Sequence, residues 1–91
     1  MANAGADITT RSTTVQLNGS ESFARIGGAL KYSWRLVGFG EYRLADINPP
    51  NSPTPTVELK SGIGRYIFEL TVEDSEGAKN TDTVTVTLRL P

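Results

Sequence analysis

Residues 64–88 read GRYIFELTVEDSEGAKNTDTVTVTL, and this stretch decides the fold. In its first half, large apolar side chains recur at every second position, so Tyr66, Phe68 and Leu70 share one face of an extended chain. In its last part, from Thr81 to Leu88, valine and leucine alternate with threonine in the same way. A polar segment separates the two parts. The stretch therefore predicts two antiparallel strands of a β-sandwich, each with one buried face.

Shorter strand patterns precede this stretch, and none of them has a helical period. Strands are predicted at residues 6–9, 14–17, 30–36 and 56–59. Residues 38–47 are less regular, and the proline-rich segment 48–55 is predicted to be an extended surface loop, because proline has no backbone donor for a central ladder. Asn18-Gly19 predicts a tight turn with positive φ. These patterns predict an all-β, immunoglobulin-like Greek-key sandwich of about seven strands in two sheets.

The predicted core is built from aromatic and aliphatic side chains, because the chain has no cysteine for an inter-sheet disulfide. Immunoglobulin-type sandwiches bury a tryptophan of a central strand between the sheets. A tyrosine corner would place Tyr66 two residues before a core position, with its hydroxyl bonded to nearby backbone. The residues expected to form this core are Leu17, Trp34, Tyr66, Phe68 and Val86.

Length and charge limit the architecture and the partners. The 91 residues predict a single domain, residues 1–91. The nine basic and ten acidic side chains nearly cancel, and the basic ones are scattered singly, so we expect no binding to nucleic acid. No apolar run is long enough to span a bilayer, so we expect no membrane insertion, and any export signal is expected outside this chain.

Catalysis is not expected. With no histidine and no cysteine, the Ser-His-Asp and Cys-His arrangements are impossible. A pair of catalytic carboxylates would need a cleft, which a lone small sandwich hardly offers, and Glu69 and Glu73 are predicted to lie on a solvated strand face. The sequence therefore predicts no enzyme, no catalytic residue and no cofactor.

Several motifs together resemble the polycystic kidney disease (PKD) domain. They are Gly-x-Tyr-x-Phe-x-Leu-x-Val-x-Asp-x-x-Gly at 64–77, Tyr-Ser-Trp at 32–34, NAGAD at 3–7, VQLNGS at 15–20, INP at 47–49 and TDTVTV at 81–86. The resemblance implies a seven-stranded, non-catalytic module of a larger secreted or cell-surface protein, with its termini at opposite poles. It implies a spacer, or a contact for cell-surface proteins or polysaccharides, with other domains of the same polypeptide as partners. We expect a monomer.

The resemblance also bears on calcium, which some members of the family hold near the beginning of the domain. It marks Asn3 and Asp74 as candidate ligands. The loop that would supply two further carboxylates reads Ala-Arg-Ile-Gly at residues 24–27 instead. Calcium takes about six to eight oxygen ligands, and a guanidinium nearby opposes it, so we expect no calcium. Asp74 is expected to bond turn amides, with Gly77 in the left-handed region.

Two alternative functions remain open. A carbohydrate-binding module would present exposed aromatic rings, for which Phe23, Phe39 and Tyr42 are the candidates, although capping of the sandwich end is the favoured role for them. A small immunoglobulin-like virion surface protein is suggested by an initial methionine without an export signal. The threonine row at 81–87 is expected to be a solvated strand face, and the glycosylation pattern at 18–20 a simple turn.

Overall fold

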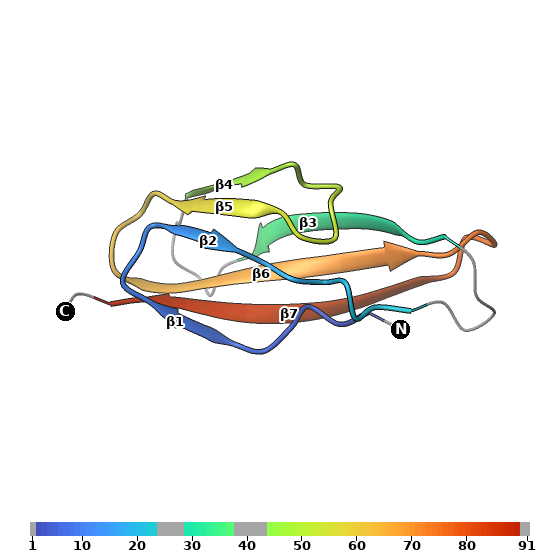
Figure 1. Cartoon of the computed structure of the whole chain (residues 1–91), viewed down its shortest axis with the longest axis horizontal. Coiled ribbons are helices and arrows are strands. Elements are labelled where there is room, and N and C mark those ends of the chain that lie inside the picture. The colour runs from blue at the N-terminus through green and yellow to red at the C-terminus, as the bar shows by residue number, and fades with distance from the viewer. Residues whose placement is uncertain (1, 24–28, 38–43, 90–91) are drawn as a thin grey trace.

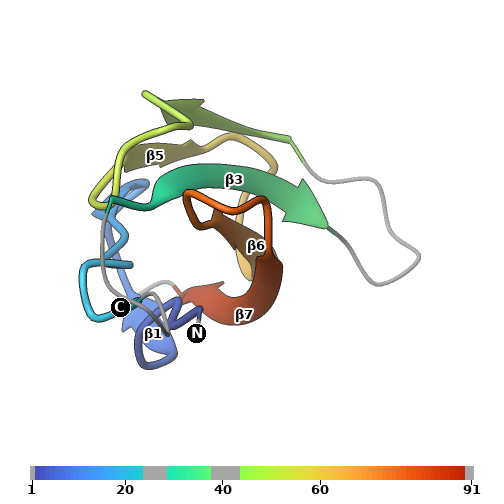
Figure 2. The same cartoon turned by 90° about the vertical axis from the view of Figure 1, so that its right-hand side faces the viewer.

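The computed structural model describes residues 2–23, 29–37 and 44–89. Within these ranges the chain forms seven strands and no helix. The strands are β1 Ile8–Thr10, β2 Thr14–Gln16, β3 Lys31–Val37, β4 Ala45–Asn48, β5 Thr56–Leu59, β6 Gly64–Glu73 and β7 Lys79–Leu88. They form one sheet in the order β1-β7-β6-β3 and a second in the order β2-β5-β4, stacked as two layers (Figures 1 and 2). The predicted all-β sandwich is confirmed.

The four-stranded sheet is organised around the predicted pair of long strands. β6 and β7 are antiparallel along their full length, from Gly64 opposite Leu88 to Glu73 opposite Lys79. β3 adds antiparallel to the other side of β6, and β1 adds parallel to β7 (Figure 1). Side chains of alternating type thus point to the core from β6, β7 and β3, as the period of two predicts.

The first strand is later and shorter than predicted, because side chains hold the segment before it. The predicted strand 6–9 is replaced by Ile8–Thr10. The N–H of Ala4 donates to Asp82 Oδ2 at 2.7 Å, and the N–H of Thr85 donates to Asp7 Oδ1 at 3.0 Å. These carboxylates take the place of backbone partners along the edge of β7.

The core lies between the two sheets. The five residues expected there, Leu17, Trp34, Tyr66, Phe68 and Val86, are each at most 3% exposed. The indole N–H of Trp34 donates to the Ser52 carbonyl at 2.9 Å. The Tyr66 hydroxyl accepts the N–H of Ser61 at 2.8 Å and donates to the Gly62 carbonyl at 2.6 Å, so the expected tyrosine corner is present.

The proline-rich segment is more than the solvated loop that was predicted. Residues 49–55, which we call the proline strap, link the two sheets through their carbonyl oxygens. Prolines lack a donor but keep an acceptor, and the prediction considered only the missing donor. Backbone N–H groups donate to these carbonyls: Trp34 to Pro50 at 2.9 Å, Gly19 to Pro53 at 2.6 Å and Leu17 to Pro55 at 2.9 Å.

The predicted positive-φ turn at Asn18-Gly19 is wrong. Among the described glycines, positive φ occurs at Gly5, Gly62, Gly64 and Gly77, and not at Gly19. Gly19 is needed for space instead. A Cβ at this position would lie 2.7 Å from Leu70 Cδ2 and 2.9 Å from Trp34 Cζ2. Glycine is therefore required because the backbone passes directly over the core.

The described end of segment 38–47, which was predicted to be irregular, contains most of a strand. β4 occupies Ala45–Asn48 and pairs antiparallel with β5. Its inward residues, Ala45 and Ile47, are only half-buried, so the alternation is too short and too weak to be recognised in the sequence. No helix in the described ranges is long and apolar enough to cross a membrane.

Candidate functional site

The proposed aromatic contact residues are only partly placed. Phe23 lies in the described segment after β2 and is 57% exposed. Phe39 and Tyr42 lie outside the described residues. The other aromatic side chains of the described ranges, Tyr32, Trp34, Tyr66 and Phe68, are buried or half-buried. An exposed ring for stacking on a sugar is thus found at Phe23 alone within those ranges.

The two candidate calcium ligands are used in separate local turns. Asn3 Oδ1 accepts the N–H of Gly5 at 2.9 Å. Asp74 Oδ1 accepts the N–H groups of Glu76 and Ala78, each at 2.9 Å. In the part of the chain that the structure describes, no three side chains of the His, Cys, Asp or Glu type gather where they could hold a metal ion.

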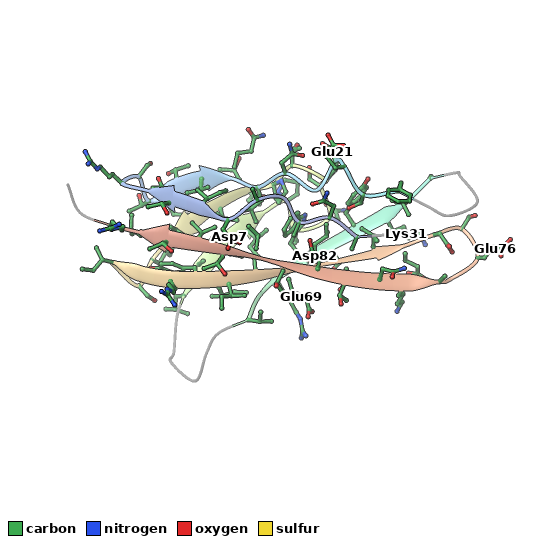
Figure 3. The ribbon with its side chains drawn as sticks, turned by 90° about the horizontal axis from the view of Figure 1, so that it is seen from below. Asp7, Glu21, Lys31, Glu69, Glu76 and Asp82 are labelled. Atoms are coloured by element: carbon green, nitrogen blue, oxygen red, sulfur yellow. The ribbon has the colours of Figure 1, made fainter. Side chains whose placement is uncertain are left out.

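The outer face of the four-stranded sheet carries the predicted threonine row. Thr81 and Thr83 are exposed, whereas Thr85 and Thr87 are half-buried. Charged residues of both signs interrupt this hydroxyl face. Arg35 Nε and Glu69 Oε1 form an ion pair of 2.8 Å there (Glu69 is labelled in Figure 3). The face is therefore mixed and polar, without a dominant charge.

A surface hollow lies at the end of the molecule where β6 begins and β7 ends. It has a volume of about 560 Å³ and is lined by Ile63, Gly64, Arg65, Thr87, Leu88 and Arg89. Gly64, with φ of 134°, leaves the floor without a side chain. The alternation of residues along a strand gives no sign of this hollow, because its walls come from the ends of two different strands.

Sequence and structure comparisons agree with this architecture. Residues 2–88 match the family described as K319L-like, PKD domain. The chain belongs to the PKD domain family. The solution structure of the PKD domain from the KIAA 1837 protein superposes with a TM-score of 0.77, at 26% identity, over 98% of this chain and 85% of that chain.

A second solved structure shares the fold of this PKD domain. It is a nucleoside hydrolase-related hypothetical protein from Saccharophagus degradans, described as associated with carbohydrate metabolism. The TM-score is 0.73 and the identity 19%, over 92% of this chain and 22% of that chain, so the PKD domain matches about a fifth of the larger protein. No curated protein sequence matches the chain.

Membership of the PKD domain family bears on whether a catalytic role is expected. PKD domains are generally non-catalytic modules of larger proteins. The features that this PKD domain offers to a partner are therefore its surfaces: an exposed ring at Phe23, a mixed polar sheet face and the hollow between Arg65 and Arg89.

Proposed function

We propose that this PKD domain is a spacer in a larger secreted or cell-surface protein and that it resists tension along its long axis. The observation that carries the proposal is the parallel pairing of β1 with β7, with Ile8 opposite Val86 and Thr10 opposite Leu88. The chain enters β1 and leaves β7 at opposite ends of this pair (Figure 1).

The parallel pair is loaded in shear when the chain is pulled from its two ends. All backbone bonds between the two strands then bear the load together, whereas peeling would break them one after another. Two side-chain hydrogen bonds between the N-terminal segment and β7 add to this resistance: Asp82 accepts the N–H of Ala4, and Asp7 accepts the N–H of Thr85. The domain is also elongated, with principal dimensions of 44 × 23 × 19 Å. Both features suit a spacer.

Force spectroscopy with cysteine handles tests the proposal, because the chain has no cysteine of its own. The pair Ala6→Cys and Arg89→Cys pulls β1 and β7 in shear, since Ala6 precedes β1 and Arg89 follows β7. The pair Ala6→Cys and Thr83→Cys pulls both strands from the same end and peels them apart. The three positions are exposed, so the handles should not disturb the core.

We expect a severalfold higher unfolding force for the shear pair than for the peeling pair. Equal thermal midpoints of the two double variants would show that the handles themselves are matched. Equal unfolding forces would contradict a spacer that works under tension.

The carbohydrate-binding alternative is tested separately. Pull-down on insoluble polysaccharides should retain no more of the wild-type chain than of its Phe23→Ala variant, because Phe23, the exposed ring among the described residues, offers little stacking area by itself. Retention that depends on Phe23 would favour the alternative.

A further inference from the structure

We propose that this PKD domain docks end to end on a second copy of itself, with the acidic turn between β6 and β7 of one copy seated in the arginine-walled hollow of the next. The acidic turn comprises residues 74–77. The inference goes beyond the proposed function, because it concerns a contact between two copies of the chain.

The hollow presents unpaired positive charge. Arg65 and Arg89 line it, and both are exposed. Among the described residues, the ion pairs use the other cations Arg35 and Lys60, and neither lining arginine takes part. Arg65 and Arg89 are therefore available to carboxylates.

Lys60, which directly follows β5, already forms an ion pair. Its ammonium lies 3.0 Å from Asp46 Oδ2. The hydrogen bond to Asp46, followed by the charge of the same carboxylate, raises the pKa of Lys60. Among the described residues, the cations that line the hollow are therefore Arg65 and Arg89. A guanidinium can donate two parallel N–H bonds to one carboxylate.

The acidic turn at the opposite end is held by hydrogen bonds, and its residues 75–77 are exposed. Asp74 fixes it by accepting two turn amides, and Gly77 has φ of 83°, as predicted. Glu76 stands exposed at its tip, at the far end of the molecule from the hollow (Figure 3). No lysine or arginine occurs within residues 74–77, and Lys79 and Lys31 lie beside the turn, each opposite Glu73. The carboxylate that the turn itself offers to a partner is that of Glu76, because Asp74 is engaged by the amides of Glu76 and Ala78.

The geometry aligns the two charged features on one axis. The same β6–β7 ladder begins at the hollow, where Gly64 faces Leu88, and ends at the acidic turn, where Glu73 faces Lys79. At about 3.4 Å per residue, the two ends lie roughly 30 Å apart. Two different patches in contact form a head-to-tail interface, which can repeat along a row of copies. The hollow lies where the chain leaves β7, since Leu88 and Arg89 line it.

The lining of the hollow offers apolar and hydroxyl groups as well as positive charge. Ile63 and Leu88 give it an apolar wall, and Thr87 adds a hydroxyl. A tight turn presents carboxylates, backbone carbonyls and aliphatic carbon together, which matches arginines beside an apolar wall. The second copy is therefore the occupant that the charges and the lining favour.

The test uses the purified chain, with sedimentation equilibrium for association and backbone amide shifts for the contact. We expect association at low ionic strength that is lost at about 0.5 M salt, where screening reaches within a few ångströms. The amides of Arg65 and Thr87 and those of Glu76 and Gly77 should shift together as the protein concentration rises.

Charge reversals at each end sharpen the test. One double variant, Arg65→Glu with Arg89→Glu, makes the hollow acidic, so that it faces an acidic turn. The other, Ser75→Lys with Glu76→Lys, makes the turn basic, so that it faces the arginines. Each should abolish association. Mixing the two double variants should restore it. All four positions are exposed, and Asp74, which fixes the turn, is left in place. The control Lys31→Glu, near the acidic turn, should not weaken association.

Several results would overturn the proposal. These are absence of concentration-dependent association up to the solubility limit, association that ignores the charge reversals, or amide shifts confined to other surfaces. Acetate or sulfate that shifts the hollow's amides without any contact between copies would assign the hollow to a small anion instead. Single-molecule pulling does not depend on any of these results, so failure here leaves the spacer proposal to its own test.

Discussion

The two sheets of the sandwich are held together in different ways. In the four-stranded sheet, β6 and β7 are ten residues each and pair along their whole length. In the three-stranded sheet, strands are three or four residues long, and β2 continues beyond its ladder by donating to the proline strap. One sheet depends on regular pairing, and the other depends on carbonyl oxygens supplied by an irregular segment.

The difference teaches where the sandwich should be most sensitive. In the long ladders, a change at an outward-facing position of β6 or β7 affects one of many cross-strand pairs, each worth roughly 0.2–1 kcal/mol. The strap meets the rest of the molecule at few points, and two of them belong to Trp34: its backbone N–H on Pro50 and its indole N–H on Ser52. Trp34 thus joins the regular sheet to the irregular one.

The largest expected effect is that of Trp34→Ala. It removes a nearly buried ring and leaves the Ser52 carbonyl without its donor, so unfolding free energy should fall by about 3–5 kcal/mol. Urea denaturation measures this. Trp34→Phe, which keeps a ring but loses the donor, should fall between the variant and wild type. An unchanged urea midpoint for Trp34→Ala would end the view that this residue links the sheets.

Gly19→Ala should have the next largest effect. Its methyl group would meet Leu70 Cδ2 and Trp34 Cζ2 at separations shorter than contact, so we expect a loss of about 1–3 kcal/mol. The same substitution made in a Leu70→Ala background should cost less, since the space is then available. Equal costs in both backgrounds would show that crowding against the core is not the cause.

A smaller effect is expected from Tyr66→Phe at the corner. It removes the hydroxyl that bonds Ser61 and Gly62 and leaves the ring packed, so the loss should be roughly 0.5–1.5 kcal/mol. Phe68→Leu, in the same strand, controls for changes of packing without a change of hydrogen bonds. A neutral Tyr66→Phe would mean that the regular sheet does not need this corner to fix the turn before β6.

The smallest effects are expected from the two surface ion pairs, one on each sheet. Glu69→Gln breaks the pair with Arg35, and since Glu69 is half-buried we expect a loss of about 0.2–1 kcal/mol. Asp46→Asn breaks the pair with Lys60, which is fully solvated, and should leave the thermal midpoint unchanged. A larger loss from Asp46→Asn than from Glu69→Gln would reverse the comparison between the sheets.

Much of the fold could be predicted because apolar and polar residues alternate along its strands. Local alternation predicts which face Tyr66, Phe68 and Leu70 share and that Trp34 points inward. Turn chemistry predicts the left-handed conformation of Gly77. Gly19 and the proline strap could not be predicted in the same way. Their roles depend on what lies opposite in space, namely the indole ring and the backbone donors of other strands.

The candidate sites were less accessible to sequence reasoning. Asn3 and Asp74 each had a local turn role that competes with metal binding, and the structure shows both in such turns. The hollow brings together Arg65 and Arg89, which are more than twenty positions apart in the sequence. Because the basic residues are scattered singly along the chain, their positions in the sequence do not reveal it. Charges become informative only when the topology gathers them at one end.

The pairing of β1 with β7 also bears on how the chain is made. The partners Asp7 and Thr85 are separated by 78 residues, and so are Ala4 and Asp82. A ribosome releases the N-terminal segment first, so that segment must wait until β7 has emerged, 78 residues later, before its edge can close. Such long-range closure slows folding and makes the final step nearly all-or-none. A nascent chain stalled before β7 would therefore expose an unpaired edge of β6. Such an edge is prone to aggregation and is the kind of surface that chaperones bind.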